Sequence, residues 1–218
     1  MNDTRHPRLF AAFGIGSVVA ELAGVAIGAI GGRPFVTITS SPADVRSAYD
    51  GSVGVAAWAG AYLEMISVGM FLAFAIWACM RLGGGLLGAI AAAAATAYTA
   101  VTMASLGIGD ALAYRAGHGM GVQLATTLST LNEAVYVCTW FLAVFYLLAI
   151  APMALADGRR VVGWSAVGVS LVTLVTTAVS LDNLGQMSNI LWLLWIIGTS
   201  VSLARGSTEA ARTEMALA

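Results

Sequence analysis

The sequence predicts an all-α polytopic membrane protein, a bundle of six transmembrane helices with both termini in the cytoplasm. Hydrophobic residues make up 59% of the 218 residues and charged residues only 10%, with a mean hydropathy of +0.87. This composition leaves no polar surface for a water-soluble domain. The apolar residues also gather in runs about as long as the ~20 residues that cross a bilayer. The basic residues between these runs are distributed unequally, which sets the orientation.

Six apolar runs fill almost the whole chain, so a single transmembrane domain is expected over residues 1–218. Charged or glycine-rich breaks separate predicted spans at about residues 9–31, 54–80, 84–109, 122–153, 161–181 and 184–204. The leader MNDTRHPR before the first run is typical of a secretory signal. However, Glu21 interrupts this run and no clear A-x-A site follows, so an uncleaved first helix is expected.

Arginine alone determines the orientation, because the chain contains no lysine. One side is predicted to hold Arg5, Arg8, Arg81, Arg159, Arg160, Arg205 and Arg212, and the other Arg33, Arg46 and Arg115. Arginine-rich connections stay in the cytoplasm, so both termini are expected there, in the plasma membrane of a bacterium. The longest outer connection contains Ser41, Pro42 and Asp44, which predict the start of a short surface helix. This outer connection is either a solvated connector between the first two spans or a lid.

Several functional classes are excluded at this stage. The net charge of −1 argues against nucleic acid as a partner. Cys79 and Cys138 lie inside predicted spans, and His6 and His118 lie outside them, so no disulfide framework, zinc site or haem site is expected. The chain also lacks a Walker loop and an aspartate cluster that would hold magnesium against a diphosphate. No metal and no cofactor are therefore predicted.

Three carboxyl groups, Glu21, Glu64 and Glu133, lie well inside predicted spans, where a charged residue costs ~2.5 to 3.5 kcal/mol or more. Counted from the outer helix ends near Gly31, Gly54 and Gly121, they lie 10, 10 and 12 residues deep. That is ~15 to 18 Å at the rise of an α-helix, which predicts a common level near the bilayer midplane. No basic residue is expected at this depth. At least one acid should then keep its proton, because burial and mutual repulsion disfavour the charged form.

The neighbours of these acids predict a polar chamber inside the bundle. Small residues share a helical face with Glu21 (Gly14, Ser17, Gly24, Gly28) and with Glu64 (Ala57, Gly60, Ser67). The catalytic candidates are Glu133, Glu64 and Glu21, with Glu133 slightly favoured as the proton donor because Tyr136 and Trp140 follow it on the same face. The substrate-binding candidates are Tyr136, Trp140, Tyr62, Phe71, Tyr98, Asn189, Trp192 and Thr130. The polar face of Gln123, Thr126 and Thr130 predicts that the chamber opens outward. The simpler alternative is that each acid is neutral and joins two helices through a hydrogen bond.

A protonated carboxyl group beside aromatic rings can protonate an alkene and stabilise the resulting carbocation, as in terpene cyclisation. The segments ELAGVAIGAI, SPADVRSAYDG and NILWLLWIIGTSVSLARG resemble small six-helix membrane proteins of actinobacteria. Some proteins of this kind act as membrane-bound terpene cyclases in natural-product biosynthesis, including cyclases of prenylated indoles. The resemblance implies a cofactor-independent isomerase acting on a lipophilic prenylated molecule, with Glu21, Glu64 and Glu133 as its acidic residues.

Two other functions stay open. A proton-coupled carrier would use three midplane carboxyl groups equally well, and with six spans it would require a homodimer. The four prolines, however, lie at span ends or outside spans, and the two halves show no repeat, so the broken helices and repeats common in carriers are not indicated. A non-enzymatic sensor or assembly subunit would need only packed helices and a polar seam.

Overall fold

The computed structural model describes residues 7–33, 36, 40–48, 53–116, 118, 121–179 and 185–217. In this part of the chain it confirms the all-α fold class and six helices long and apolar enough to cross a membrane. The long helices are α1 (Pro7–Ile30), α3 (Val55–Arg81), α4 (Gly85–Ala116), α5 (Val122–Ala156), α6 (Arg160–Val179) and α7 (Gly185–Leu217). The short helix α2 (Pro42–Ala48) lies between α1 and α3 in the chain.

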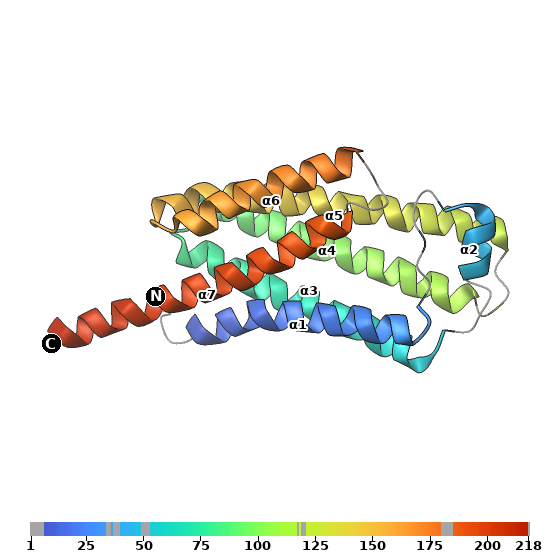
Figure 1. Cartoon of the computed structure of the whole chain (residues 1–218), viewed down its shortest axis with the longest axis horizontal. Coiled ribbons are helices and arrows are strands. Elements are labelled where there is room, and N and C mark those ends of the chain that lie inside the picture. Colours follow the sequence, from blue (N-terminus) through green and yellow to red (C-terminus); the bar gives the residue numbers. More distant parts are fainter. Residues whose placement is uncertain are drawn as a thin grey trace.

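The six long helices form a closed ring in which each contacts two neighbours. The order around the ring is α1, α3, α4, α5, α6, α7 and back to α1. Helix α1 begins and helix α7 ends at the same end of the bundle, as the predicted orientation requires (Figure 1). We call this end inner and the opposite end, which carries α2, outer.

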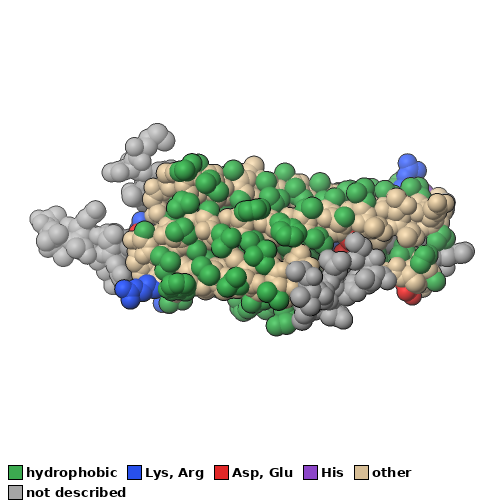
Figure 2. Space-filling model, turned by 90° about the horizontal axis from the view of Figure 1, so that it is seen from above, with side chains coloured by type: hydrophobic (Ala, Val, Ile, Leu, Met, Phe, Trp, Pro, Cys, Tyr) green, Lys and Arg blue, Asp and Glu red, His purple; other side chains and the backbone are tan. Residues whose placement is uncertain are grey.

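The outside of the bundle is apolar. Figure 2 shows hydrophobic side chains along the length of the molecule and arginine side chains near its two ends. Large apolar residues point outward on every long helix, including Val19, Ile66, Ile90, Phe145 and Leu171. Since lipid is the only solvent that favours such a surface, the chain is a multi-pass membrane protein.

Helices α4 and α5 are longer than predicted and exceed the thickness of a bilayer. They contain 32 and 35 residues, which gives lengths of about 48 and 52 Å against ~30 Å of hydrocarbon. Figure 1 shows their outer ends, together with α2, extending past the outer ends of α6 and α7. The end of a helix therefore does not by itself mark the membrane surface, and the common level predicted for Glu21, Glu64 and Glu133 stays a prediction.

Helix α2 confirms the short helix predicted after Ser41. The Ser41 hydroxyl oxygen accepts a hydrogen bond from the Asp44 backbone N–H (3.2 Å), and an Asp44 carboxylate oxygen accepts one from the Ser41 N–H (3.2 Å). This reciprocal pair is a capping box, which fixes the start of a helix. Val45 is buried, and α2 packs against α5.

The contact between α1 and α3 is a seam of glycines with almost no side chains between the two backbones. A Cβ atom added to Gly60 would lie 2.5 Å from the Gly24 carbonyl oxygen and 2.6 Å from the Gly28 nitrogen. A Cβ atom on Gly24 would lie 2.8 Å from the Gly60 carbonyl oxygen, and one on Gly31 only 2.0 Å from the Ala57 nitrogen. The small faces predicted around Glu21 and Glu64 therefore pack directly on each other.

We predict that Gly60→Ala destabilises the protein by about 1 to 3 kcal/mol, because the new methyl group meets fixed backbone atoms and must push the helices apart. The matched control is Gly69→Ala on the same helix, where an added Cβ meets no atom within 4 Å. The control should be neutral or stabilising by up to ~1 kcal/mol, since alanine is the better helix former. Unfolding in detergent micelles measures both variants, and equal stabilities would contradict the close contact.

Candidate functional site

A cavity of about 480 Å³ lies among α1, α3, α4, α5 and α7. Its lining on α1 runs from Ser17 to Ala29, with Arg33 added after the end of the helix, and its lining on α4 runs from Tyr98 to Gly109. Both stretches run from the middle of their helix toward its outer end. Trp140, Trp192 and Ile196 line it from α5 and α7. The volume falls within the ~300 to 1,000 Å³ typical of small-molecule sites.

Most of the residues selected from the sequence meet in this cavity. Those that line it are Glu21, Glu64, Glu133, Phe71, Tyr98, Tyr136, Trp140, Asn189 and Trp192. Two of the selected residues do not line it. Tyr62 points outward with 66% of its surface exposed, and the exposed Thr130 donates its hydroxyl hydrogen to the Thr126 carbonyl oxygen (2.9 Å). Of the outer connection, Arg33 and Val36 line the cavity, whereas no described side chain of helix α2 does.

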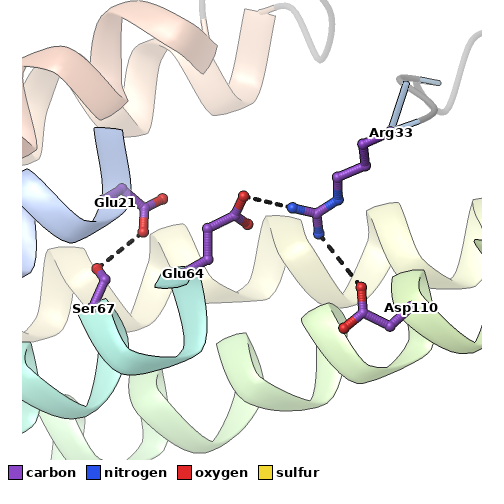
Figure 3. Close-up of polar contacts among 5 residues, drawn as sticks. All are labelled: Glu21, Arg33, Glu64, Ser67 and Asp110. Carbon is purple, nitrogen blue, oxygen red and sulfur yellow. Dashed lines mark hydrogen bonds and ion pairs between the residues drawn. The ribbon is translucent and has the colours of Figure 1, made fainter. Parts of the chain in front are cut away.

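The expectation that no basic residue reaches the acids is wrong. Arg33 donates a hydrogen bond from Nη1 to Oε1 of Glu64 at 2.5 Å, and its Nη2 atom lies 3.9 Å from Oδ1 of Asp110 (Figure 3). The Glu64 side chain is only 9% exposed and that of Arg33 is 25% exposed. A buried carboxylate with a guanidinium partner is stabilised in its charged form.

The local sequence explains how an arginine from the outer connection reaches this depth. Helix α1 ends in a Schellman motif, in which Gly32 has a left-handed φ of +74°. The Gly32 N–H bonds the Ala29 carbonyl (3.1 Å) and the Arg33 N–H bonds the Gly28 carbonyl (3.0 Å). This turn reverses the chain, so the long Arg33 side chain extends back toward Glu64. A basic residue directly after a Gly-Gly helix end was the sequence signal that could have predicted the ion pair.

Glu21 has a different partner from Glu64. The Ser67 hydroxyl on α3 donates a hydrogen bond to Oε2 of Glu21 at 3.0 Å, across the α1–α3 seam. Figure 3 shows Glu21 and Glu64 side by side, with Arg33 on the far side of Glu64. The two carboxyl groups therefore differ chemically, since one is bound to a cation and the other to a neutral hydroxyl.

The outer wall of the cavity carries further hydrogen-bonding groups. Ser105 on α4 donates its hydroxyl hydrogen to the Asn132 side-chain oxygen on α5 (2.9 Å), and Asn132 directly precedes Glu133 in the chain. Thr102 also lines the cavity, and its buried hydroxyl oxygen has no hydrogen-bond partner among the described residues. Asn189 faces this group of residues from α7. The outer wall can therefore bind a polar group of a ligand.

The inner end of the cavity is aromatic. Phe71, Tyr98 and Trp192 come from α3, α4 and α7, and their ring centroids lie 5.2 to 5.7 Å apart. We call these three residues the aromatic floor. Tyr146, which is fully buried, supports the floor through edge contacts with Phe71 (5.8 Å) and Trp192 (6.1 Å). Ring-to-ring contacts of this kind hold each ring in a fixed orientation.

The cavity also reaches the lipid-facing surface. Val25 on α1 and Ile190 on α7 both line it, yet 51% and 58% of their surfaces are exposed. Helices α1 and α7 are neighbours in the ring. Residues that are at once cavity lining and outer surface mark a lateral opening, through which a hydrocarbon chain can enter from the bilayer.

Comparisons of the chain with protein families, with curated proteins and with solved structures gave no match. Among the described residues, no group of three or more His, Cys, Asp or Glu side chains is arranged to hold a metal ion. The chemistry of the cavity is therefore inferred from its own residues.

We predict energetic coupling between Arg33 and Glu64. Arg33→Gln and Glu64→Gln should each lower the free energy of unfolding by about 1 to 3 kcal/mol, less than the ~3 to 5 kcal/mol of a fully buried pair, because Arg33 is partly exposed. The double variant should lose clearly less than the sum of the single variants. Denaturant titration of all four proteins in micelles measures the coupling, and additive effects would show that the two side chains do not interact.

We also predict that the cavity can be reached from the outer side. In a protein whose Cys79 and Cys138 are replaced by alanine, Asn189→Cys should react with a membrane-impermeant thiol reagent added to intact cells. Asp157→Cys, at the inner end after α5, is the control and should react only after the membrane is permeabilised. Labelling of Asn189→Cys only after permeabilisation would place the opening on the cytoplasmic side.

Proposed function

We propose that this protein is a membrane-bound terpene cyclase of the bacterial plasma membrane, which cyclises a prenyl chain by protonating it. One observation carries the proposal: a carboxyl group with a neutral partner, Glu21, lies in the wall of an aromatic chamber that opens to lipid. A prenylated molecule is lipophilic, so it would enter between α1 and α7 with its chain toward the aromatic floor. Its polar part would then face Asn132 and Asn189.

Glu21 is the preferred proton donor. Glu64 is bound to the Arg33 guanidinium, which favours its carboxylate form, whereas Glu21 accepts a hydrogen bond from the neutral Ser67 hydroxyl. Glu21 also lies within electrostatic range of Tyr98, a residue of the aromatic floor, and of Tyr136. A proton leaving Glu21 would therefore enter the part of the chamber where a cation is best stabilised.

The proposed reaction begins when Glu21 gives its proton to one carbon of the terminal alkene, which leaves a tertiary carbocation on the other carbon. The next double bond attacks this carbon, a C–C bond closes the ring, and the positive charge moves along the chain. The faces of the aromatic floor stabilise that charge through cation-π attraction. A carbon beside the final cation then loses a proton to a carboxylate, for which Glu133 is placed near Tyr136 on the opposite wall. Substrate and product have equal mass, so no cofactor is consumed.

A proton-coupled carrier is the second candidate, and one specific observation favours it. Arg33 lies between two carboxyl groups, 2.5 Å from Glu64 and 3.9 Å from Asp110. An arginine that can exchange carboxylate partners is typical of groups that release and bind protons during transport. In that case a homodimer would be expected, and purified protein in liposomes would move protons together with a solute.

We predict that Glu21→Gln abolishes cyclisation while the protein stays folded. Glutamine keeps the shape and accepts the Ser67 hydrogen bond but cannot give up a proton to an alkene, and general acid catalysis contributes ~100-fold to 10,000-fold in rate. The matched control is Asp157→Asn, an acid-to-amide change at the inner end, where Asp157 pairs with Arg159 at 2.7 Å far from the cavity. Membranes containing each variant are incubated with farnesylated and geranylgeranylated acceptors, and cyclic isomers are separated by chromatography.

Glu21→Gln should then show at most 1/100 of the rate of the control. If Glu21→Gln cyclises the substrate at the rate of the parent, Glu21 is not the proton donor. If Glu64→Gln and Glu133→Gln also cyclise it at that rate, the acid mechanism is wrong. If the parent forms no cyclic product and moves protons together with a solute in liposomes, the carrier proposal replaces the cyclase proposal.

A further inference from the structure

We propose that the chamber is a binding site for a lipophilic organic cation, an ammonium head carried on a hydrocarbon chain. This ligand class goes beyond the cyclisation proposed above, because it requires only the walls of the chamber and no reaction. Four features of the cavity support it: its charge, its aromatic lining, its lateral opening and the position of its arginine.

The acidic groups in the wall outnumber the basic ones. Glu21, Glu64 and Glu133 line the cavity, and Arg33 is the one basic residue among the described lining residues. The charge of Arg33 is directed at Glu64 and Asp110, and Glu21 contacts a neutral hydroxyl. Glu21 holds its proton in the empty chamber and would release it when a cation binds, because a nearby positive charge stabilises the carboxylate form. Acidic groups in a poorly hydrated wall then attract a cation far more strongly than the same groups would in water.

The aromatic lining is suited to a large, weakly hydrated cation. Phe71, Tyr98 and Trp192 form the floor, and Tyr136 and Trp140, whose rings lie edge to face at 5.9 Å, line α5. Ring faces attract alkylammonium groups through their quadrupoles, and several rings around one site form the aromatic cage that recognises such groups. A small hydrated ion such as Na⁺ would gain less, because it would have to lose its water to contact the rings.

The lateral opening leaves room for a hydrocarbon chain on the ligand. Val25 and Ile190 connect the cavity to the lipid-facing surface between α1 and α7. A head group in the chamber could therefore keep an alkyl tail in the bilayer or along these two side chains. Arg33 at the outer end already pairs with the carboxyl groups of Glu64 and Asp110. An anionic head group would therefore meet three acids in the described lining and no cation there that is free to bind it.

The experiment uses the purified full chain in lipid nanodiscs, with empty nanodiscs as the reference for partition into lipid. Octyltrimethylammonium is titrated and compared with octyl dimethylphosphine oxide, which is uncharged but has a head of similar size, and with octyl sulfate. Isothermal titration calorimetry and the fluorescence of the tryptophans report binding. The parent should bind the cation at least tenfold more tightly than the neutral compound and should not bind the sulfate above the reference.

Two pairs of variants locate the site. Glu21→Gln should weaken binding of the cation at least tenfold, whereas Asp157→Asn should not change it. Tyr136→Leu should weaken binding several-fold, whereas Tyr62→Leu, at a residue that points away from the cavity, should bind as the parent does. Tyr136 is 39% exposed, so its replacement leaves no buried void and tests the ring without disturbing the fold.

Equal affinity for the cation and the neutral compound would overturn the proposal, and so would unchanged binding in both Glu21→Gln and Tyr136→Leu. The same nanodiscs are assayed for cyclic products, which separates this inference from the proposed function. Selective binding of the cation without cyclisation supports the site and removes the cyclase, whereas cyclisation without a preference for the cation removes the site.

Discussion

The direct backbone contact between α1 and α3 is the constraint on which the site depends. Gly24 and Gly60 let the two helices approach until the backbone of each meets the other, and Gly31 does the same against Ala57 at the outer end. Packing of this kind holds membrane helices together because lipid offers no hydrophobic force between them. It also fixes the position of the acids, since Glu21 lies one turn from Gly24 and Glu64 one turn from Gly60. The Glu21–Ser67 hydrogen bond crosses this same contact.

The seam places two carboxyl groups together, and their partners make them different. Arg33 binds Glu64 from the outer end, which balances one charge and joins the end of α1 to α3 and, through Asp110, to α4. Glu21 faces the aromatic side with a hydroxyl partner. Two neighbouring acids with unlike partners can take unlike roles, one as a fixed charge and the other as a proton donor. The chamber therefore combines a polar outer wall, a carboxyl group with a neutral partner and an aromatic inner floor.

The sequence predicted the fold well because its strongest signals are those that a bilayer imposes. Six apolar runs predicted the six long helices and, because six is an even number, the start of α1 and the end of α7 at one end of the bundle. The Ser41–Asp44 cap predicted α2. The small faces around Glu21 and Glu64 also predicted their contact, because helical spacing alone shows which residues share a side. Part of the cavity lining, Glu133, Tyr136 and Trp140, followed from the same rule applied to α5.

Other features of the site could not be predicted from the sequence, because they depend on distances between residues that helical spacing does not give. The full length of α4 was not predicted, since a helix can continue past the membrane surface without a change in its periodicity. The Arg33–Glu64 pair depends on a left-handed turn at Gly32 and on the reach of a long side chain. Tyr62 was selected by residue type and general position, and Thr130 by its place on the polar face of residues 122–153. A rotation of one residue, about 100° around the helix axis, decides whether a side chain meets the cavity or the lipid.

The infrared spectrum of the protein in lipid at neutral pH tests the central claim most directly, because the stretching band of a protonated carboxylic acid is separate from that of a carboxylate. Glu21 beside Ser67 and Glu64 beside Arg33 should give different bands. The account predicts a protonated-acid band that disappears in Glu21→Gln and persists in Glu64→Gln. A parent spectrum without this band, or a band that disappears in Glu64→Gln and not in Glu21→Gln, would contradict the division of roles between the two acids.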